Sequence, residues 1–165
     1  MATVNVVFGS TTGETERYAN IIAEALGVTA VAVGDADLDT YGADVLLLGS
    51  STWGYGDLQD DWAAGIDLLD AVDLAGKKVG LFGCGDSIGF ADTFANALGT
   101  LADKVTERGG TLIGAIEPPA AYPTESMACR DGKFIGLALD STNEADLADE
   151  LTAAWIDQIK AEAGL

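Results

Sequence analysis

The most informative segment of the sequence is Phe8-Gly9-Ser10-Thr11-Thr12-Gly13-Glu14-Thr15-Glu16, near the amino terminus. It follows an apolar run at 4–8 that is typical of a strand, and it opens an amphipathic pattern over 14–26 that is typical of a helix. A loop between a strand and a helix presents free backbone N–H groups and the positive end of the helix dipole. Four hydroxyl side chains in this loop can then bind phosphate oxygens: Ser10, Thr11, Thr12 and Thr15. An ordinary helix cap, formed by Ser or Thr together with Glu, is the alternative interpretation.

The loop lacks the residues of two better-known phosphate sites. It contains no Lys and no Gly-x-x-x-x-Gly-Lys-Ser/Thr pattern, so a triphosphate site of the P-loop type is not expected. The dinucleotide pattern Gly-x-Gly-x-x-Gly is missing as well. A monophosphate bound by neutral donors is the interpretation that remains.

The composition predicts one α/β domain spanning 1–165. The 165 residues are 48% hydrophobic and include 21 glycines, which suits many tight turns between strands and helices. No segment reaches the roughly 18 consecutive apolar residues of a membrane span, and the first residues do not resemble a secretion signal. We therefore expect a cytoplasmic protein in which Cys84 and Cys129 stay reduced. Histidine is absent, which argues against Ser-His-Asp hydrolases and against His-based zinc sites.

The chain is strongly acidic, with 27 acidic and 8 basic residues and a formal charge of −19. Nucleic acid and anionic membrane surfaces are therefore not expected as partners, because both require neutralisation by Lys or Arg. The acidity fits a surface that docks basic partner proteins, and it equally fits general solvation such as adaptation to salt. A candidate docking face is the Asp-rich stretch formed by Asp57, Asp60, Asp61, Asp67, Asp70 and Asp73. A solvated helix face is the alternative for the same residues.

Short apolar runs alternate with longer helical patterns along the chain. The expected strands are 4–8, 29–33, 45–48, 79–82 and 111–116. The expected helices are 14–26, 59–69, 91–108 and 144–163. This alternation predicts an α/β fold with a doubly wound, five-stranded parallel sheet and helices on both faces.

One segment, 117–133, breaks the alternation. It contains all three prolines and little periodicity, and it is followed by an apolar run at 134–139 that again resembles a strand. We expect an insertion that interrupts the last strand, which resumes after it. A long irregular loop often has a role, although an excursion over the surface is the alternative.

Ligands of doubly wound sheets bind beyond the carboxyl ends of the strands, where the strand order reverses. Three loops should meet there: 10–15, 50–57 and 83–90. The second contains Trp53 and the third Phe90, each beside glycines. Aromatic plates next to a phosphate cradle predict a flat, phosphorylated cofactor held by stacking.

These loops resemble those of one family, the flavodoxins, and specifically its long-chain class. The resemblance covers the whole chain and rests on four motifs in the order of that family: Gly9-Ser10-Thr11-Thr12-Gly13-x-Thr15-Glu16, Thr52-Trp53-Gly54-x-Gly56-x-Leu58-Gln59-x-Asp61-Trp62, Phe82-Gly83-x-Gly85-Asp86-x-Ile88-Gly89-Phe90-Ala91-Asp92 and Phe134-Ile135-Gly136-Leu137-Ala138-Leu139-Asp140. The resemblance implies non-covalently bound FMN in an electron-transfer protein that is not itself an enzyme. It also implies one-electron transfer at low potential, between semiquinone and hydroquinone.

The resemblance also assigns residues to parts of FMN. The phosphate would lie against the first loop: Ser10, Thr11, Thr12, Gly13, Glu14 and Thr15. Ser51 and Thr52 would lie near the ribityl chain, and Trp53 would stack on the inner face of the flavin with Gly54 and Tyr55 beside it. Phe90 would stack on the outer face. Backbone groups of Cys84, Gly85 and Asp86 would meet the pyrimidine edge.

The chain departs from the family pattern at two positions. Phe90 stands where the family usually has Tyr, which keeps the stacking ring and removes a hydroxyl. Gly54 stands where long-chain members often have Asn, and it would ease a peptide rotation that accompanies reduction.

The implied partners are basic redox proteins: a flavodoxin or ferredoxin reductase as donor and low-potential enzymes as acceptors, with this chain as a monomer. An FMN-dependent oxidoreductase such as a quinone reductase is the alternative function on the same fold. A phosphoacceptor receiver domain is a third class. It needs an Asp at the end of the third strand, where this chain has Leu48-Gly49-Ser50.

Overall fold

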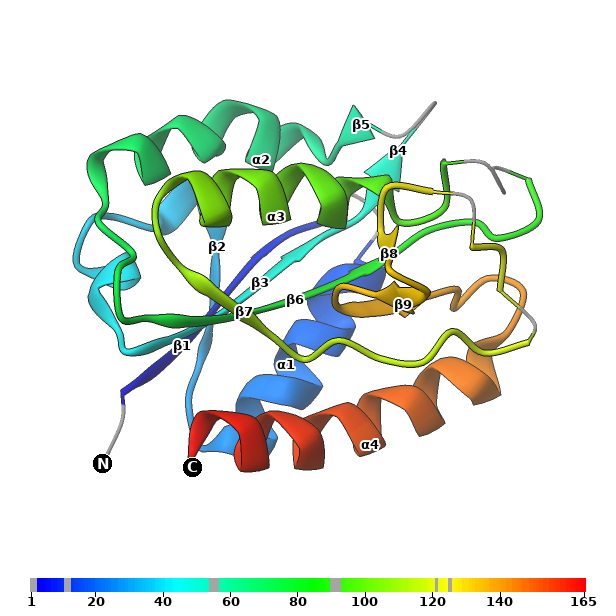
Figure 1. The fold of residues 1–165 in the computed structure, drawn as a ribbon. Coiled ribbons are helices and arrows are strands. Elements are labelled where there is room, and N and C mark those ends of the chain that lie inside the picture. Colours follow the sequence, from blue (N-terminus) through cyan, green and yellow to red (C-terminus); the bar gives the residue numbers. More distant parts are fainter. Residues whose placement is uncertain (1–2, 11–12, 54–56, 90–92, 121, 125) are drawn as a thin grey trace.

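The computed structural model describes residues 3–10, 13–53, 57–89, 93–120, 122–124 and 126–165. These residues form a parallel sheet between two layers of helices (Figure 1). The strands lie in the order β10-β6-β3-β1-β2. Strand β7 lies off this order and pairs with β6, as β10 does. The expected doubly wound sheet is thereby confirmed.

The main sheet is parallel throughout. Its strands are β1 (Val4–Gly9), β2 (Ala30–Ala32), β3 (Val45–Ser50), β6 (Lys78–Cys84), β7 (Thr111–Ile113) and β10 (Leu137–Leu139). Every residue of β3 is buried, as the continuous apolar run predicts for a strand covered on both faces. Two small antiparallel pairs lie outside the sheet: β4 (Thr52–Trp53) with β5 (Asp57–Leu58), and β8 (Cys129–Arg130) with β9 (Lys133–Phe134).

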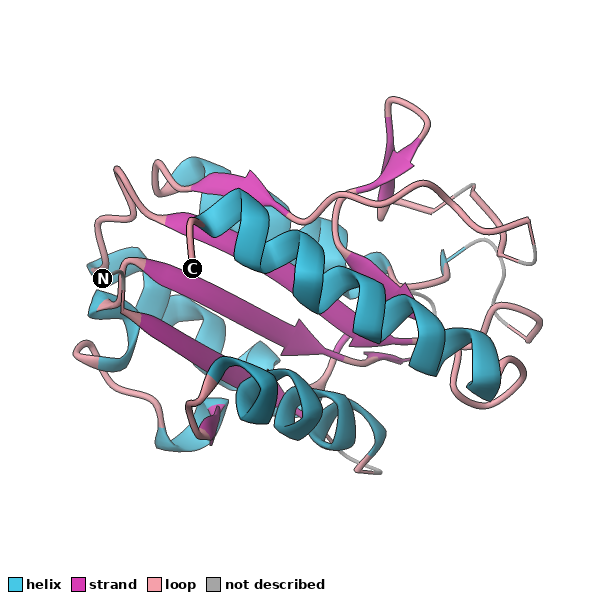
Figure 2. Cartoon of the chain, turned by 90° about the horizontal axis from the view of Figure 1, so that it is seen from below, coloured by secondary structure: helices cyan, strands magenta, loops and turns pink. Residues whose placement is uncertain are grey.

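Helices cover both faces of the sheet. They are α1 (Glu14–Leu26), α2 (Asp60–Gly65), α3 (Asn96–Glu107) and α4 (Ala145–Ala163). Short 3-10 helices lie at Val33–Asp35, Thr40–Gly42 and Ile66–Ala71. In Figure 1, α2 and α3 lie above the sheet and α1 and α4 below it, and Figure 2 shows the latter two side by side.

Each helical layer encloses its own half of the core. Side chains that alternate along the strands point to opposite faces, so Leu46 and Leu48 belong to one half and Leu47 to the other. The half under α2 and α3 is completed by Trp62, Leu98 and Leu101, among others. The half under α1 and α4 is completed by Tyr18, Ile22, Trp155 and Ile159, among others.

The last strand is interrupted, as the sequence predicts. β7 pairs with the first part of β6 (Thr111 opposite Lys78), and β10 pairs with its second part (Leu137 opposite Phe82). β7 ends at Ile113, earlier than expected, because Gly114 turns the chain with φ +84° and its carbonyl accepts a hydrogen bond from Trp155 Nε1 at 2.8 Å.

Two expected helices begin or end at other residues. The pattern at 91–108 forms a helix only from Asn96, because Ala95 has φ +58°, which a helix does not accommodate; residues 91–92 lie outside the described part of the chain. The pattern at 59–69 begins with Gln59 as a cap, whose Oε1 accepts hydrogen bonds from the next turn, and it continues past Gly65 as a 3-10 helix.

Candidate functional site

The three predicted loops leave the sheet at one edge. Gly9 of β1 lies opposite Ser50 of β3, and Cys84 of β6 lies opposite Leu139 of β10, so all four strands end at the same level. The strand order reverses between β1 and β3, because β2 lies on one side of β1 and β3 on the other. This is the switch point at which doubly wound sheets bind their ligands.

The first loop closes on itself through Ser10. Its Oγ accepts a hydrogen bond from the N–H of Gly13 at 3.1 Å, and Gly13 takes φ +92° as the residue before α1. Glu14 begins the helix with an exposed side chain. Thr11 and Thr12, which the sequence places in the same site, lie outside the described residues.

The side-chain oxygen of Thr15 gives the clearest indication that this loop binds a ligand. Thr15 is 1% exposed, and its Oγ1 has no hydrogen-bond partner within the described part of the chain. Buried polar atoms are normally satisfied, so an unpartnered one calls for an explanation such as an absent ligand. An anionic group bound at the start of α1 would supply the missing partner.

The second loop is fixed through Ser50 and Thr52. Ser50 Oγ donates to the carbonyl of Ser51 at 2.9 Å and accepts from the N–H of Gln59 at 3.3 Å. Thr52 Oγ1 accepts from the N–H of Ala97 at 3.0 Å, so it caps α3 from a distant part of the sequence. Ser51 is buried next to them. The backbone of Trp53 belongs to β4, whereas Gly54 and Tyr55 lie outside the described residues.

The third loop begins at Cys84. Burial raises the pKa of the Cys84 thiol to about 12. The N–H of Gly85 donates to the carbonyl of Leu139 at 2.9 Å, so this N–H extends the sheet and is not available to a ligand. Phe90, the predicted outer stacking residue, lies outside the described residues.

A polar network that the sequence analysis missed lies behind the third loop. Asp140 is fully buried at the end of β10, and its carboxylate accepts hydrogen bonds from Ser87 and Asn143. Burial by itself raises the pKa of Asp140, but the hydrogen bonds from Ser87 and Asn143 outweigh it, so the pKa lies below its ordinary value. The available signal was a charged residue directly after the buried apolar run at 137–139.

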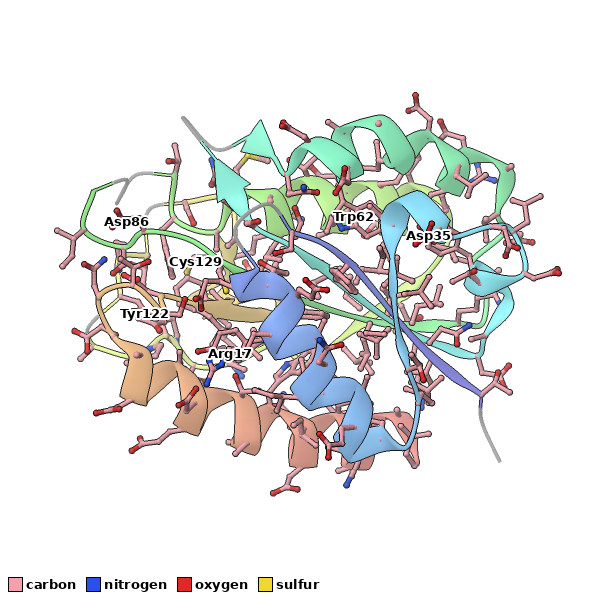
Figure 3. All side chains as sticks on the ribbon, turned by 180° about the vertical axis from the view of Figure 1, so that it is seen from behind. Arg17, Asp35, Trp62, Asp86, Tyr122 and Cys129 are labelled. Atoms are coloured by element: carbon pink, nitrogen blue, oxygen red, sulfur yellow. The ribbon has the colours of Figure 1, made fainter. Side chains whose placement is uncertain are left out.

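The insertion packs against this region. The rings of Phe94, Tyr122 and Phe134 contact one another with centroids 5.0–6.4 Å apart. Tyr122 Oη accepts a hydrogen bond from the N–H of Asp140 at 3.0 Å, and the N–H of Met127 donates to Asn96 Oδ1 at 2.7 Å. Figure 3 shows Tyr122, Cys129 and Asp86 at the same end of the molecule, so the insertion supports the predicted site from the outside.

Basic side chains of the described chain do not enter the first loop. Arg17, one turn into α1, directs Nη1 to Asp149 at 3.5 Å and lies over the ring of Tyr18. Lys77 and Lys78 bind backbone carbonyls at the opposite edge of the sheet. An anion at the first loop would therefore be held by neutral donors, as the sequence predicts.

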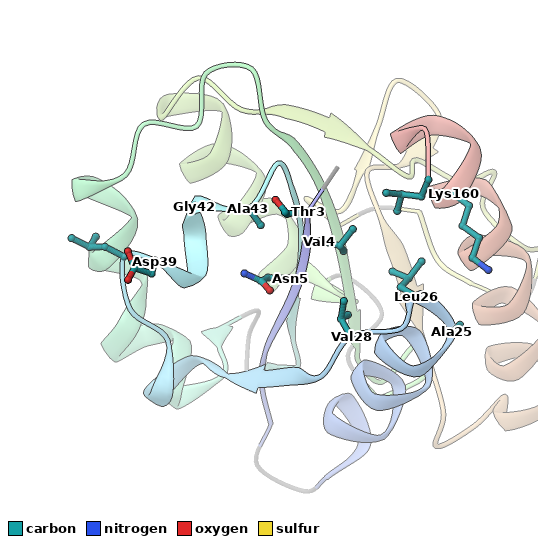
Figure 4. Close-up of a pocket in the computed structure, with 12 residues that line it drawn as sticks. Thr3, Val4, Asn5, Ala25, Leu26, Val28, Asp39, Gly42, Ala43 and Lys160 are labelled. Carbon is teal, nitrogen blue, oxygen red and sulfur yellow. The ribbon is translucent and has the colours of Figure 1, made fainter. Parts of the chain in front are cut away.

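A separate cavity of about 780 Å³ lies at the amino-terminal edge of the sheet (Figure 4). It is lined by Val4, Leu26, Val28 and Lys160, among others. None of the predicted site residues lines it, and its walls are mostly aliphatic.

These features define a class: a doubly wound α/β protein with a loop of neutral donors at its switch point. The comparisons specify the family. The Flavodoxin family model matches residues 6–155. The chain is 42% identical over 171 residues to a flavodoxin of Picosynechococcus sp. and 40% identical over 173 residues to flavodoxin 1 of Escherichia coli. These alignments cover all of this chain and 100% and 97% of the respective relatives.

A solved structure agrees with this result. The flavodoxin of Fusobacterium nucleatum, crystallised with flavin mononucleotide, superposes with a TM-score of 0.91 at 28% identity, covering 98% of this chain and 99% of that one. The chain belongs to the flavodoxin family, whose members are electron-transfer proteins serving partner proteins. Within the described residues, no helix combines the length and apolar character that crossing a bilayer requires.

Proposed function

We propose that this chain binds FMN non-covalently and carries one electron at a time, between the one-electron-reduced and the fully reduced cofactor. The observation that carries the proposal is the buried, unpartnered hydroxyl of Thr15 at the start of α1, in a loop of neutral donors at the switch point. The Fusobacterium relative, crystallised with flavin mononucleotide, supports the same cofactor. Bound FMN supplies the one-electron chemistry, and the chain supplies its position and surroundings.

The proposed contacts follow the order of the loops. The phosphate lies against the first loop, with Ser10, Thr11, Thr12, Gly13, Glu14 and Thr15. Ser51 and Thr52 lie near the ribityl chain. The oxygen of Thr52 already accepts from Ala97, so its hydroxyl proton is the part available to FMN.

The ring would be held by the other two loops. Trp53 stacks on its inner face, with Gly54 and Tyr55 beside it, and Phe90 stacks on its outer face. The backbone of Cys84 and Asp86 and the carbonyl of Gly85 meet the pyrimidine edge. The buried Cys84 thiol acts as a small apolar neighbour, because its raised pKa keeps it protonated at neutral pH.

The surroundings of the site disfavour additional negative charge. Arg17 is engaged by Asp149, the carboxylate of Asp86 belongs to the third loop, and that of Asp140 lies behind it. These groups would lower the potential of a step that adds negative charge to a bound flavin. Each tenfold change in the equilibrium corresponds to about 59 mV for a one-electron couple.

We further propose that the chain acts as a monomeric single domain, 1–165, that docks basic redox proteins. The donor would be a flavodoxin or ferredoxin reductase, and the acceptors would be low-potential enzymes. The side chains that support this are the exposed carboxylates of α2 and the following turns: Asp60, Asp61, Asp67, Asp70 and Asp73. Solvation or salt adaptation remains the alternative role for the same residues. The two free cysteines fit a reducing compartment such as the cytoplasm.

The test is a stepwise dithionite reduction followed by visible spectroscopy. A one-electron carrier shows flavin bands and then a long-wavelength band near half reduction. Direct bleaching in a two-electron step would instead support the oxidoreductase alternative. A colourless protein that cannot be reconstituted with FMN would refute both.

A further inference from the structure

A buried carboxylate holds the turn after β6. Asp140 Oδ2 accepts hydrogen bonds from the N–H of Ser87, at 2.9 Å, and from the hydroxyl of Ser87. Asp140 Oδ1 accepts from the N–H groups of Thr142 and Asn143 at 3.1 and 2.9 Å. One side chain therefore joins the end of β10 to a turn that lies 53 residues earlier in the sequence.

Asn143 extends this connection to the tip of the turn. Its Nδ2 donates to Asp140 Oδ2 at 2.8 Å and to Asp86 Oδ1 at 3.0 Å. Asp86 Oδ1 also accepts from the N–H groups of Ile88 and Gly89 at 3.0 and 2.7 Å. We call this set of side chains the loop anchor; it consists of Asp140, Ser87, Asn143 and Asp86.

Among the described residues of this turn, those at its tip have little apolar packing. Ile88 is 73% exposed, and Gly89 is exposed as well. Exposed segments with few buried contacts open easily unless hydrogen bonds restrain them. The hydrogen bonds of the loop anchor are therefore the main restraint on residues 86–89.

We propose that Asp140 is a positioning residue that, through the loop anchor, holds residues 85–89 in the conformation that receives the flavin. This inference rests on the proposed function. A ligand binds only the competent fraction of a loop, so its apparent Kd rises in inverse proportion to that fraction. Asp140 thus acts on FMN through the order of the turn rather than by touching the cofactor.

The test compares Asp140→Asn, Ser87→Ala and the double variant. Asn keeps the shape of Asp140, but its charge and one of its acceptor atoms are lost. We expect FMN to bind the reconstituted Asp140→Asn protein about tenfold more weakly, which is about 1.4 kcal/mol. Ser87→Ala should shift binding in the same direction. The double variant should bind FMN no more weakly than Asp140→Asn alone, because both substitutions affect the same contact between Ser87 and Asp140.

Two further readouts separate positioning from a general loss of stability. In the apoprotein, the amides of residues 87–89 should exchange with solvent about tenfold faster in Asp140→Asn, while amides of β1 and β3 keep their protection. At saturating protein, the visible circular dichroism of bound FMN should change, because the ring sits against a less ordered turn.

Asp44→Asn is the matched control. It removes the same charge directly before β3, at the end of the sheet opposite the site, where Asp44 Oδ2 accepts hydrogen bonds from the N–H and the hydroxyl of Thr3 at 3.1 and 3.4 Å. This variant should bind FMN like the unmodified protein.

The proposal is overturned if Asp140→Asn binds FMN normally, or if exchange at 87–89 stays unchanged. It is also overturned if only Asp140→Asn, and not Ser87→Ala, alters binding, because the charge of Asp140 would then act directly. Should Asp140→Asn fail to fold, Ser87→Ala alone decides through the same readouts. Failure of the unmodified protein to bind FMN would refute the proposed function, while amide exchange in the apoprotein would still test the anchor.

Discussion

Replacing Thr15 with Val should stabilise the apoprotein and weaken FMN binding, two effects of opposite sign. The Thr15 side chain is 1% exposed, and its Oγ1 has no partner among the described residues. A buried unsatisfied polar group costs about 1–3 kcal/mol, and Val has a similar shape without that group. We expect the free energy of unfolding of the apoprotein to rise by about 1 kcal/mol, the lower end of that range.

The effect on FMN follows from the bond that the hydroxyl would make. A hydrogen bond to a charged phosphate contributes about 1.5–3 kcal/mol. Its loss should raise the Kd for FMN by about 10- to 150-fold. Riboflavin, which has the same ring without a phosphate, should bind both proteins equally.

Urea unfolding of the apoprotein and fluorescence titration with the two flavins measure these quantities. The control is Thr152→Val, because Thr152 is 2% exposed but its Oγ1 donates to the carbonyl of Ala148 at 2.8 Å. That variant should lose about 1 kcal/mol of stability and bind FMN normally. Two outcomes would contradict this role of the Thr15 hydroxyl: a Thr15→Val apoprotein that is destabilised as the control is, or a Kd for FMN that changes by less than about twofold.

Three further predictions concern packing, thiol chemistry and pH. Gly83→Ala should lower the free energy of unfolding in urea by about 3 kcal/mol, because the added Cβ would lie 1.9 Å from a carbonyl oxygen of β3. Gly34→Ala is the control, because a Cβ there meets no atom within 4 Å and should change stability little. Equal losses of stability in the two variants would contradict this prediction. In the native protein at pH 8, iodoacetamide should label the half-buried Cys129 and spare the buried Cys84, because the pKa of the Cys84 thiol is raised to about 12. Mass spectrometry measures the labelling of each cysteine, and equal labelling would contradict this prediction. The pKa of Asp140 is lowered in the folded protein, so its carboxylate stabilises the fold at pH values above the ordinary carboxyl pKa of about 3.9. This stabilisation is lost as the pH falls below that value, so the stability difference between the unmodified protein and Asp140→Asn should shrink at low pH. A stability difference that grows towards low pH would contradict this prediction.

The regular elements could be predicted from the sequence because their signals are local. Helix α1 has the predicted bounds, 14–26, since its apolar stripe, its preceding Gly13 and its following Gly27 all act within a few residues. The interrupted last strand was also predictable, because prolines mark the insertion and an apolar run follows it. The loop that we propose for phosphate stands out in the sequence for the same reason, because its hydroxyls and glycines are contiguous.

The supporting contacts of the site were not predictable because they join distant residues. Thr52 caps α3 across 45 positions, and Asn143 reaches Asp86 across 57. Neither contact has a periodicity or a short motif. The late start of α3 has the same cause, because the helical pattern of 91–108 does not reveal that Ala95 takes a positive φ.

The acidic residues of this chain fall into two physically different groups. Most carboxylates are exposed, and the few cations are largely occupied: Lys77 and Arg108, for example, bind backbone carbonyls. Salt screens such exposed charges over about 8–10 Å, so they act mainly on encounters with other proteins. Asp140, in contrast, is buried and keeps its charge through donated hydrogen bonds, so salt screens it much less. The exposed carboxylates can therefore serve docking or solvation, and salt would weaken their effect. The proposed effect of the loop anchor on FMN binding, in contrast, should depend little on ionic strength.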